Sequence, residues 1–263
     1  MATIARGYPS ELPLQPCDVV QEHGQRPPEH DMSVVLDREV LLRNGVFGFE
    51  NADPRNRTFV MLRSQVLRQM EEAGHRTLAV TSAQPRNGKS FVATNLAAAL
   101  SQIHPTCLVD LDLRRPTVHD RLALPDSHGS DDFLLGQDSR TVMRCGIGAA
   151  QLMVVPVNEP RASSADILAT PRLPLLLERL KQLPGAPICI LDTPPVLEGD
   201  DMMIIAQHVD QILLVVEEGR TRRSELRECL RLLRPTPLLG TVLNRVISAH
   251  KGTSYGQYHG YRP

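Results

Sequence analysis

Residues Thr77–Leu100 read TLAVTSAQPRNGKSFVATNLAAAL. A buried-strand pattern, TLAVTS, runs into a loop that ends in Gly88-Lys89-Ser90, and a helical pattern follows at once. This order fits a phosphate-binding loop with alanine in place of its first glycine, because backbone N–H groups at a helix N-terminus face phosphates, the lysine reaches the terminal phosphates and the serine hydroxyl binds Mg²⁺. The predicted loop comprises Ala83, Gln84, Pro85, Arg86, Asn87, Gly88, Lys89, Ser90 and Phe91.

On either side of this segment, short apolar runs alternate with helical stretches. The other runs are TCLVDLD, QLMVVPV, PICILD, QILLVVEE and LLGTVLN. Apolar strands that are continuous and separated by helices indicate a parallel sheet covered on both faces. We therefore predict an α/β fold, a doubly wound and mostly parallel sheet of the P-loop NTPase kind with helices on both faces.

The chain divides into three regions by composition. Residues 1–50 read as a flexible N-terminal leader, with a candidate docking segment in the more apolar stretch 34–49. Residues 51–248 carry the phosphate-loop domain, which begins with a helical pattern ending at Gly74. Residues 249–263 are rich in Gly, Tyr and His, lack periodicity and are predicted to form a mobile tail.

Composition excludes several classes of protein. A formal net charge of −1 gives no reason to expect a nucleic-acid binder. Five scattered cysteines without C-x-x-C spacing argue for a reducing compartment and against a disulfide framework or a zinc site. The N-terminus lacks a signal peptide, and no run approaches the roughly 18 apolar residues of a membrane span. These features predict a cytoplasmic protein whose membrane contact comes through a partner.

Acidic residues end two of the apolar runs. Asp110 and Asp112 come at the end of CLVDLD, and Asp192 ends ICILD. Ligands of parallel α/β sheets bind outside the carboxyl ends of the strands, so these carboxylates are expected to face the phosphate loop. There they could hold a metal ion or accept a hydroxyl proton, and Asp192 is the natural metal-supporting aspartate.

The three elements together resemble a known family. Over about residues 57–263 the chain is similar to the bacterial tyrosine kinases (BY-kinases). The resemblance rests on four features in this order: A-x4-GKS, a strand ending in D-x-D-x-R, a strand ending in DTPP, and a tyrosine-bearing tail. The resemblance implies an ATP-dependent autokinase that regulates capsule and exopolysaccharide synthesis. It implies that Lys89 and Ser90 hold ATP phosphates and Mg²⁺, that Asp192 supports the metal, and that Asn244 lies near the adenine. Asp110 and Asp112 would bind the metal and activate the tyrosine hydroxyl.

The resemblance also implies substrates and partners. Three of the four tyrosines, Tyr255, Tyr258 and Tyr261, lie in the last nine residues and would be phosphorylated by a neighbouring subunit in a ring. A membrane-embedded polysaccharide co-polymerase would recruit the protein to the inner face of the plasma membrane and activate it.

Two departures from the family pattern keep alternatives open. Arg86 stands where a glycine is expected, and only Arg63 remains of the E-x-x-R-x-x-R element that makes ring contacts. One alternative is a degenerate ATP-binding regulatory subunit of a polysaccharide export system. The other is a partition or positioning ATPase, although Gln84 occupies the place of the signature lysine of those proteins.

Overall fold

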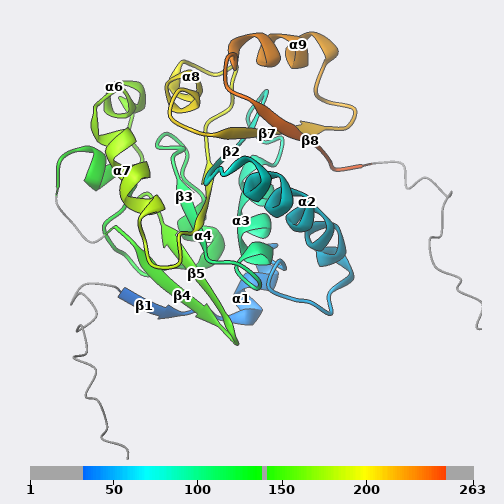
Figure 1. The fold of residues 1–263 in the computed structure, drawn as a ribbon, viewed down its shortest axis with the longest axis vertical. Coiled ribbons are helices and arrows are strands. Elements are labelled where there is room, and N and C mark those ends of the chain that lie inside the picture. The colour runs from blue at the N-terminus through cyan, green and yellow to red at the C-terminus, as the bar shows by residue number, and fades with distance from the viewer. Residues whose placement is uncertain (1–31, 138–140, 247–263) are drawn as a thin grey trace, which may run out of the picture. The chain divides into compact units, whose positions relative to one another are not determined.

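The computed structural model describes residues 32–137 and 141–246, whose strands form one eight-stranded sheet (Figure 1). The strand order across the sheet is β1-β4-β5-β3-β6-β2-β7-β8. The strands are β1 (Met32–Val35), β2 (Thr77–Ser82), β3 (Thr106–Asp110), β4 (Met143–Ile147), β5 (Ala150–Val155), β6 (Ile188–Asp192), β7 (Gln211–Glu217) and β8 (Leu238–Asn244). Residues 1–31, 138–140 and 247–263, which include Tyr255, Tyr258 and Tyr261, lie outside the described residues.

The helices connect the strands in chain order. They are α1 (Arg38–Arg43), the 3₁₀ turn η1 (Pro54–Asn56), α2 (Arg57–Ala73), α3 (Lys89–Leu100), α4 (Val118–Leu122), α5 (Ser130–Leu134), α6 (Ser164–Leu168), α7 (Arg172–Lys181), α8 (Asp201–Ala206) and α9 (Arg223–Leu232). None of these helices combines the length and the apolar character needed to cross a membrane.

The sheet is mostly parallel, as the sequence predicts. The six strands from β5 through β3, β6, β2 and β7 to β8 run in one direction. At the other edge, β4 pairs with β5 in antiparallel fashion, and β1 lies parallel to β4. The carboxyl ends of the six parallel strands therefore meet at one edge of the sheet, where the predicted site residues follow β2, β3 and β6.

Two hydrophobic cores lie on the two faces of the sheet. Leu78 and Val80 of β2 belong to one core and Ala79 to the other, because successive side chains of a strand point to opposite faces. Helices α2 and α3 contribute to the first core, and α5 to α9 contribute to the second (Figure 1). Burial on both faces explains why the strands read as continuous apolar runs.

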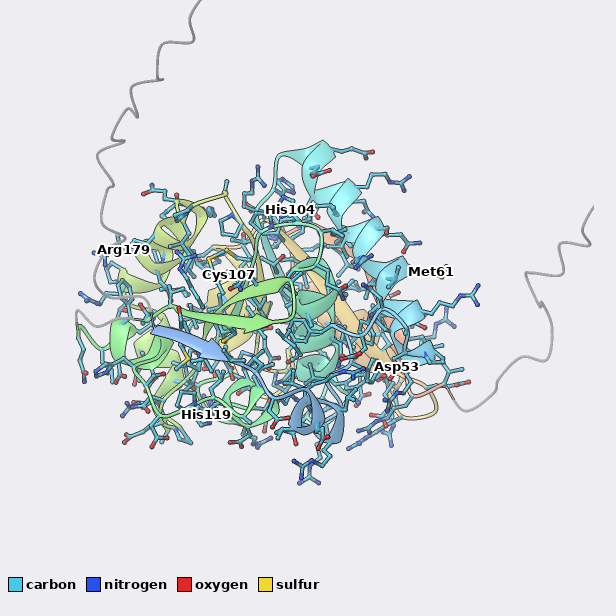
Figure 2. The ribbon with its side chains drawn as sticks, turned by 90° about the horizontal axis from the view of Figure 1, so that it is seen from below. Asp53, Met61, His104, Cys107, His119 and Arg179 are labelled. Carbon is cyan, nitrogen blue, oxygen red and sulfur yellow. The ribbon has the colours of Figure 1, made fainter. Side chains whose placement is uncertain are left out.

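The predicted helix before the phosphate loop is α2. Phe59, Val66 and Met70 are buried along one face of it, and Gly74 ends it with φ of +68°. Glycine adopts this left-handed backbone without the steric cost that a Cβ would add. Figure 2 shows Met61 on the outer side of α2, away from the sheet, and Met61 is 61% exposed.

The boundary predicted at residue 50 is wrong in the structure, because residues 32–50 are folded against the core. Strand β1 pairs with β4, and Leu41 and Phe47 are buried. The Asn95 side chain of α3 accepts hydrogen bonds from the N–H groups of Phe47 and Gly48, at 2.8 and 3.0 Å. The segment proposed as a docking segment therefore docks on the domain itself.

The buried cysteines pack in the core, as predicted. Cys107 of β3 and Cys189 of β6 are register partners in adjacent strands, and Cys229 is buried on α9. All four described cysteines are free thiols, and Figure 2 shows Cys107 inside the fold. Their burial makes them small hydrophobic residues rather than accessible thiols: Cys145 packs in the first core, and Cys107, Cys189 and Cys229 pack in the second.

Candidate functional site

The phosphate loop is a tight turn between β2 and α3. Its backbone is left-handed at Arg86, with φ of +66°, and at Gly88, with φ of +95°. The Asn87 side chain accepts a hydrogen bond from the Gln84 N–H at 3.0 Å and donates one to Glu217 Oε2 at 2.8 Å. These bonds hold the loop so that the N-terminus of α3, with its positive dipole end, opens directly beyond Gly88.

Asn244 braces the same loop from the end of β8. Its Nδ2 donates to the backbone oxygen of Asn87 at 3.0 Å. A Cβ added at Gly88 would collide with this amide group, so only glycine fits between the loop and β8. Asn244 also lines the pocket described below, and its contact with the loop is a role that the sequence analysis did not predict.

Lys89 lies among the three predicted aspartates. It is 7% exposed, and its Nζ lies 2.7 Å from Asp112 Oδ2 and 3.5 Å from Asp192 Oδ1. It also donates to Ser90 Oγ at 3.1 Å. Burial lowers the pKa of Lys89, but the negative charges of Asp192, Asp112 and Asp110 outweigh it and raise the pKa above its usual value. Lys89 is therefore a permanent cation at the entrance of α3.

Asp110 is fully buried, and its carboxylate accepts hydrogen bonds from backbone N–H groups. Oδ1 accepts from the N–H of Asp112 at 3.0 Å, and Oδ2 accepts from Thr117 and Val118 at 3.0 and 3.1 Å. Burial, together with the charge of Asp192, raises its pKa to about 8. The geometry makes Asp110 the residue that folds the 111–118 loop back on β3. The predicted roles in metal binding and hydroxyl activation remain predictions.

Asp192 is the least satisfied acid of the site. It is fully buried, and neither carboxylate oxygen accepts a hydrogen bond from the described residues. Burial raises its pKa, although the nearby charge of Lys89 works in the opposite direction. Buried polar groups are almost always paired, so two orphaned oxygens beside Ser90 and Lys89 are the signature expected of an incomplete cation site.

The donors present fit a magnesium ion that is shared with phosphates. Within residues 32–137 and 141–246, no three His, Cys, Asp or Glu side chains are arranged to hold a metal alone. Mg²⁺ is usually bound by one or two carboxylates, a hydroxyl and the phosphates of the substrate, rather than by a full cage of protein ligands. The Ser90 hydroxyl, the Asp192 oxygens that accept no hydrogen bond, and Asp112, which lines the pocket, match that pattern.

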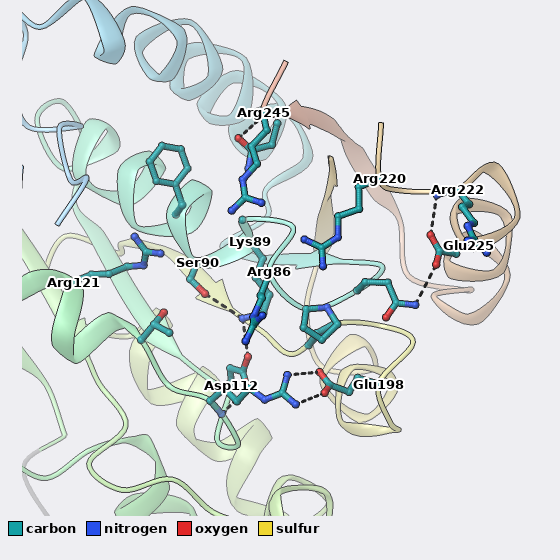
Figure 3. Close-up of a pocket in the computed structure, with 18 residues that line it drawn as sticks. Arg86, Lys89, Ser90, Asp112, Arg121, Glu198, Arg220, Arg222, Glu225 and Arg245 are labelled. Carbon is teal, nitrogen blue, oxygen red and sulfur yellow. Dashed lines mark hydrogen bonds and ion pairs between the residues drawn. The ribbon is translucent and has the colours of Figure 1, made fainter. Parts of the chain in front are cut away.

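These residues border a pocket of about 1210 Å³, shown in Figure 3. It is lined by Gln84, Pro85, Arg86, Gly88, Lys89, Ser90, Phe91, Asp112, Arg115, Thr117, Arg121, Pro195, Glu198, Arg220, Arg222, Glu225, Asn244 and Arg245. Seven cations and three acids make the pocket strongly positive, which suits a polyphosphate. Asp110 and Asp192 lie behind its wall, and Ala83 and Asn87 are buried beneath the loop.

One predicted residue lies elsewhere. Arg63 is on α2, and its Nη1 donates to the backbone oxygen of Ala99 on α3 at 2.9 Å. This bond ties α2 to α3 within the subunit. A role of Arg63 at an oligomer interface stays a prediction.

The sequence analysis missed the cationic lining of the pocket. Arg115, Thr117 and Arg121 follow β3, whereas Arg220, Arg222 and Arg245 follow β7 and β8. All lie beyond the carboxyl ends of parallel strands, and that position was the available signal. Arg115 pairs with Glu198 at 2.5 Å, and Arg245 pairs with Glu217 at 2.8 Å.

The chain is similar to several known proteins, although no family model matches it. The chain is 30% identical to the tyrosine-protein kinase Etk of Escherichia coli K12 over 71% of its length and 26% of Etk. It is 29% identical to the tyrosine-protein kinase YwqD of Bacillus subtilis over 70% of the chain and 77% of YwqD. CapB of Staphylococcus aureus is 25% identical over 76% of the chain and 87% of CapB.

Solved structures agree. The chimerical protein CapA2B2 superimposes with a TM-score of 0.69 at 25% identity, covering 82% of this chain and 94% of that one. The kinase domain of Escherichia coli Etk superimposes with a TM-score of 0.72 at 24% identity, covering 88% and 94%. The chain is thus similar in sequence and in fold to the bacterial tyrosine kinases. It spans about a quarter of the length of Etk and most of YwqD and CapB.

The main departure of the chain from the pattern of these kinases is at Arg86. The structure shows that the position requires a positive φ, where a non-glycine residue costs roughly 1–2 kcal/mol. Arg86 is exposed and lines the pocket, so its charge faces the region where phosphates would bind.

Proposed function

We propose that this chain is an ATP-dependent protein-tyrosine kinase that phosphorylates Tyr255, Tyr258 and Tyr261 of another copy of itself. The observation that carries the proposal is the contact of Lys89 with Asp112 and Asp192 at the N-terminus of α3, where the two oxygens of Asp192 accept no hydrogen bond. Phosphoryl transfer relies on positioning and charge neutralisation, and this arrangement offers both.

In the proposed reaction each group of the chain has a separate task. The backbone of residues 84–90 and the N-terminus of α3 hold the phosphates, and Lys89 binds the terminal phosphate oxygens. Bound Mg²⁺, held by Ser90 and Asp192, supplies further neutralisation of phosphate charge. Asp112, which lines the pocket, orients the incoming phenol and accepts its proton.

The transfer itself is a displacement at phosphorus. The phenolic oxygen attacks the γ-phosphorus, an oxygen–phosphorus bond forms, and the bond from that phosphorus to the β–γ bridging oxygen breaks. The products are phosphotyrosine and ADP, and the phenolic proton leaves on the Asp112 carboxylate. Phosphorylation of a tail in trans requires that two copies of the chain associate, so that the neighbouring copy supplies the acceptor tyrosine.

Regulation and location follow from the same family context. We propose that the protein acts in capsule or exopolysaccharide polymerisation and export, and that a membrane-embedded co-polymerase of that system activates it and recruits it from the cytoplasm to the membrane. The cationic rim formed by Arg220, Arg222 and Arg245 suits an acidic cytosolic segment of such a partner.

Phosphate mapping tests the proposed function. The full chain, incubated with Mg-ATP alone and with the cytosolic segment of the co-polymerase, should gain phosphate at the three tail tyrosines. The Lys89→Met variant should gain none. Absence of phosphotyrosine from the wild-type chain under both conditions would exclude the kinase.

A second candidate is a regulatory subunit that binds ATP without transferring phosphate. The strained backbone at Arg86 favours it, because strain in the phosphate loop weakens nucleotide binding. This candidate predicts nucleotide binding in wild-type protein, no phosphotyrosine, and unchanged polymer length when all three tail tyrosines are replaced by phenylalanine.

A further inference from the structure

Arg121 differs from the other arginines of the pocket. Arg86, Arg115, Arg220, Arg222 and Arg245 are exposed, whereas Arg121 is partly buried. No carboxylate of the described residues lies within ion-pair distance of its guanidinium, and its Nε is buried without a hydrogen-bond partner. A structural arginine normally satisfies its donors, and an unpaired, partly buried cation lowers stability. The described residues therefore leave the Nε of Arg121 without a hydrogen bond.

A second polar group on the same short helix has the same character. The Thr117 hydroxyl, four residues before Arg121, lines the pocket and is also buried without a hydrogen-bond partner. The two Asp192 oxygens are likewise without a hydrogen-bond partner. Thr117, the N-cap residue of α4, and Arg121 thus both line the pocket that Ser90 lines.

The position of α4 is fixed from three directions. Asp110 Oδ2 accepts hydrogen bonds from the N–H groups of Thr117 and Val118. Asn44 Nδ2 donates to the backbone oxygens of Asp120 and Arg121, at 2.9 and 3.2 Å. Val118 and Leu122 are buried in the first core. The fold therefore holds the two orphaned donors in place before any ligand binds, which is the condition for effective electrostatic catalysis.

The residues that line the pocket come from different strand ends. Asn244, Arg245 and Arg220 lie at or after the ends of β7 and β8, whereas Asp112, Thr117 and Arg121 follow β3. Arg121 therefore comes from the same strand end as Asp112, the proposed acceptor of the phenolic proton. Figure 3 shows Arg121 pointing toward Ser90, with Arg220 on the opposite side of Lys89. Burial lowers the pKa of Arg121, although the charge of Asp192 works in the opposite direction.

We propose that Arg121 and Thr117 form an oxyanion subsite that contacts the phosphoryl group while it is transferred, with Arg121 as a further catalytic residue. The inference rests on the proposed kinase function. The guanidinium takes the equatorial oxygens of the phosphoryl group on the side opposite Lys89, and the hydroxyl of Thr117 donates a hydrogen bond to the same group. Charge that develops on those oxygens would then be bound between two cations from two different elements.

Binding of a transition-state mimic tests the subsite without relying on turnover. Calorimetry on the full chain compares Mg-ADP alone with Mg-ADP plus aluminium fluoride, which stands in for the transferring phosphoryl group. In the Arg121→Met variant we expect the Mg-ADP affinity to stay within about twofold of wild type and the affinity for the fluoride complex to fall about 10²-fold or more. Arg121→Lys should recover part of the loss, and Thr117→Val should lose about 3–10-fold.

Controls separate this role from a structural one. Arg231→Met removes an exposed arginine of α9 that pairs with Glu228, and it should leave both affinities unchanged. The melting temperature of Arg121→Met should equal or exceed that of wild type, because the change removes an unpaired cation. If Arg121→Met does not fold, the Lys and Thr117→Val variants carry the same comparison.

The outcomes also separate the subsite from the kinase. Loss of the fluoride complex in Arg121→Met supports the subsite even if wild-type protein never phosphorylates tyrosine. Equal affinity of wild type and Arg121→Met for the fluoride complex would overturn the subsite, and so would a wild-type protein that binds this complex no more tightly than Mg-ADP alone.

Discussion

Two aspartates of one sheet, Asp192 and Asp210, show how differently its two ends are built. Asp192 ends β6 at the carboxyl edge, fully buried and without a hydrogen bond, and burial raises its pKa. Asp210 precedes β7 at the opposite edge, and its Oδ2 accepts three hydrogen bonds of 2.8 Å, from Arg76 N, Thr77 N and Thr77 Oγ1. An aspartate thus stabilises the fold at one edge of the sheet, whereas at the other edge an aspartate remains available to a ligand.

The cause of the contrast is the number of donors that the backbone supplies. At Asp210, burial tends to raise the pKa, but the N–H groups of Arg76 and Thr77 outweigh it and lower the pKa. At Asp192 no N–H group compensates for burial. Unsatisfied groups persist where function requires them, and other parts of the fold compensate for their cost.

The largest expected effect comes from replacing Lys89, the cation that contacts Asp112 and Asp192 at the carboxyl edge of the sheet. Lys89→Met should lower the rate of tyrosine phosphorylation by at least about 10²–10³-fold, because it removes the charge that binds the terminal phosphate. Single-turnover phosphorylation with Mg-ATP measures this effect. Arg231→Met is the control, and a Lys89→Met rate within about tenfold of wild type would contradict the assignment.

Replacing Asp192 should separate stability from activity. Asp192→Asn removes a fully buried charge that accepts no hydrogen bond, while Lys89 loses its 3.5 Å ion pair but keeps its closer partner Asp112 at 2.7 Å, so the nucleotide-free protein should become about 0.5–2 kcal/mol more stable. Stabilisation by Mg-ADP should shrink at the same time, because the cation loses a ligand. Urea unfolding with and without Mg-ADP measures both. A less stable apo variant would show that Asp192 is a structural residue.

The matched change at the other edge should have the opposite result. Asp210→Asn should lower the free energy of unfolding by about 1–2 kcal/mol, because a neutral amide accepts the three donors more weakly and an N–H donor can face an NH₂ group. Nucleotide affinity should not change, since Asp210 lies at the far end of the strands. Loss of Mg-ADP binding in folded Asp210→Asn would break the contrast between the edges.

The pH dependence of stability sharpens the same comparison. Because the folded pKa of Asp210 lies below its unfolded value, its contribution is present at neutral pH and is lost as the pH falls through and below about 4. Melting temperatures from pH 7 to pH 3 should therefore fall less steeply for Asp210→Asn than for wild type. If melting temperature fell equally steeply with pH in both proteins, the ionisation of Asp210 would not contribute to the pH dependence of stability.

The smallest expected effect is at Arg86. Arg86→Gly relieves a left-handed backbone strain of roughly 1–2 kcal/mol, but glycine loses about 0.5–1 kcal/mol more conformational entropy on folding. The net gain in stability should stay below about 1.5 kcal/mol. A large change in nucleotide affinity together with unchanged stability would show instead that the arginine charge binds phosphate.

The sequence predicted the parallel part of the fold well. The six apolar runs became β2, β3, β5, β6, β7 and β8, because strands buried on both faces leave a continuous apolar signal. The phosphate loop and the three aspartates converge around Lys89 and Ser90, as strand-end positions imply.

The antiparallel edge and the α4 lining were missed for physical reasons. Strand β1 is only four residues long and pairs with β4 across more than a hundred residues, a contact that no local pattern encodes. The turn at Gly148-Ala149 between β4 and β5 was a readable hairpin signal that went unused. Thr117 and Arg121 look like ordinary polar residues until the bonds from Asp110 fold their helix back over the pocket.

The brace between Asn244 and the phosphate loop has a mechanical consequence. Asn244 contacts Asn87, and the next residue, Arg245, pairs with Glu217, which itself holds the Asn87 side chain. These contacts link the carboxyl end of β8 to the phosphate loop. A partner that displaced Asn244 or Arg245 would therefore alter the loop, and with it nucleotide binding, without contacting the nucleotide itself.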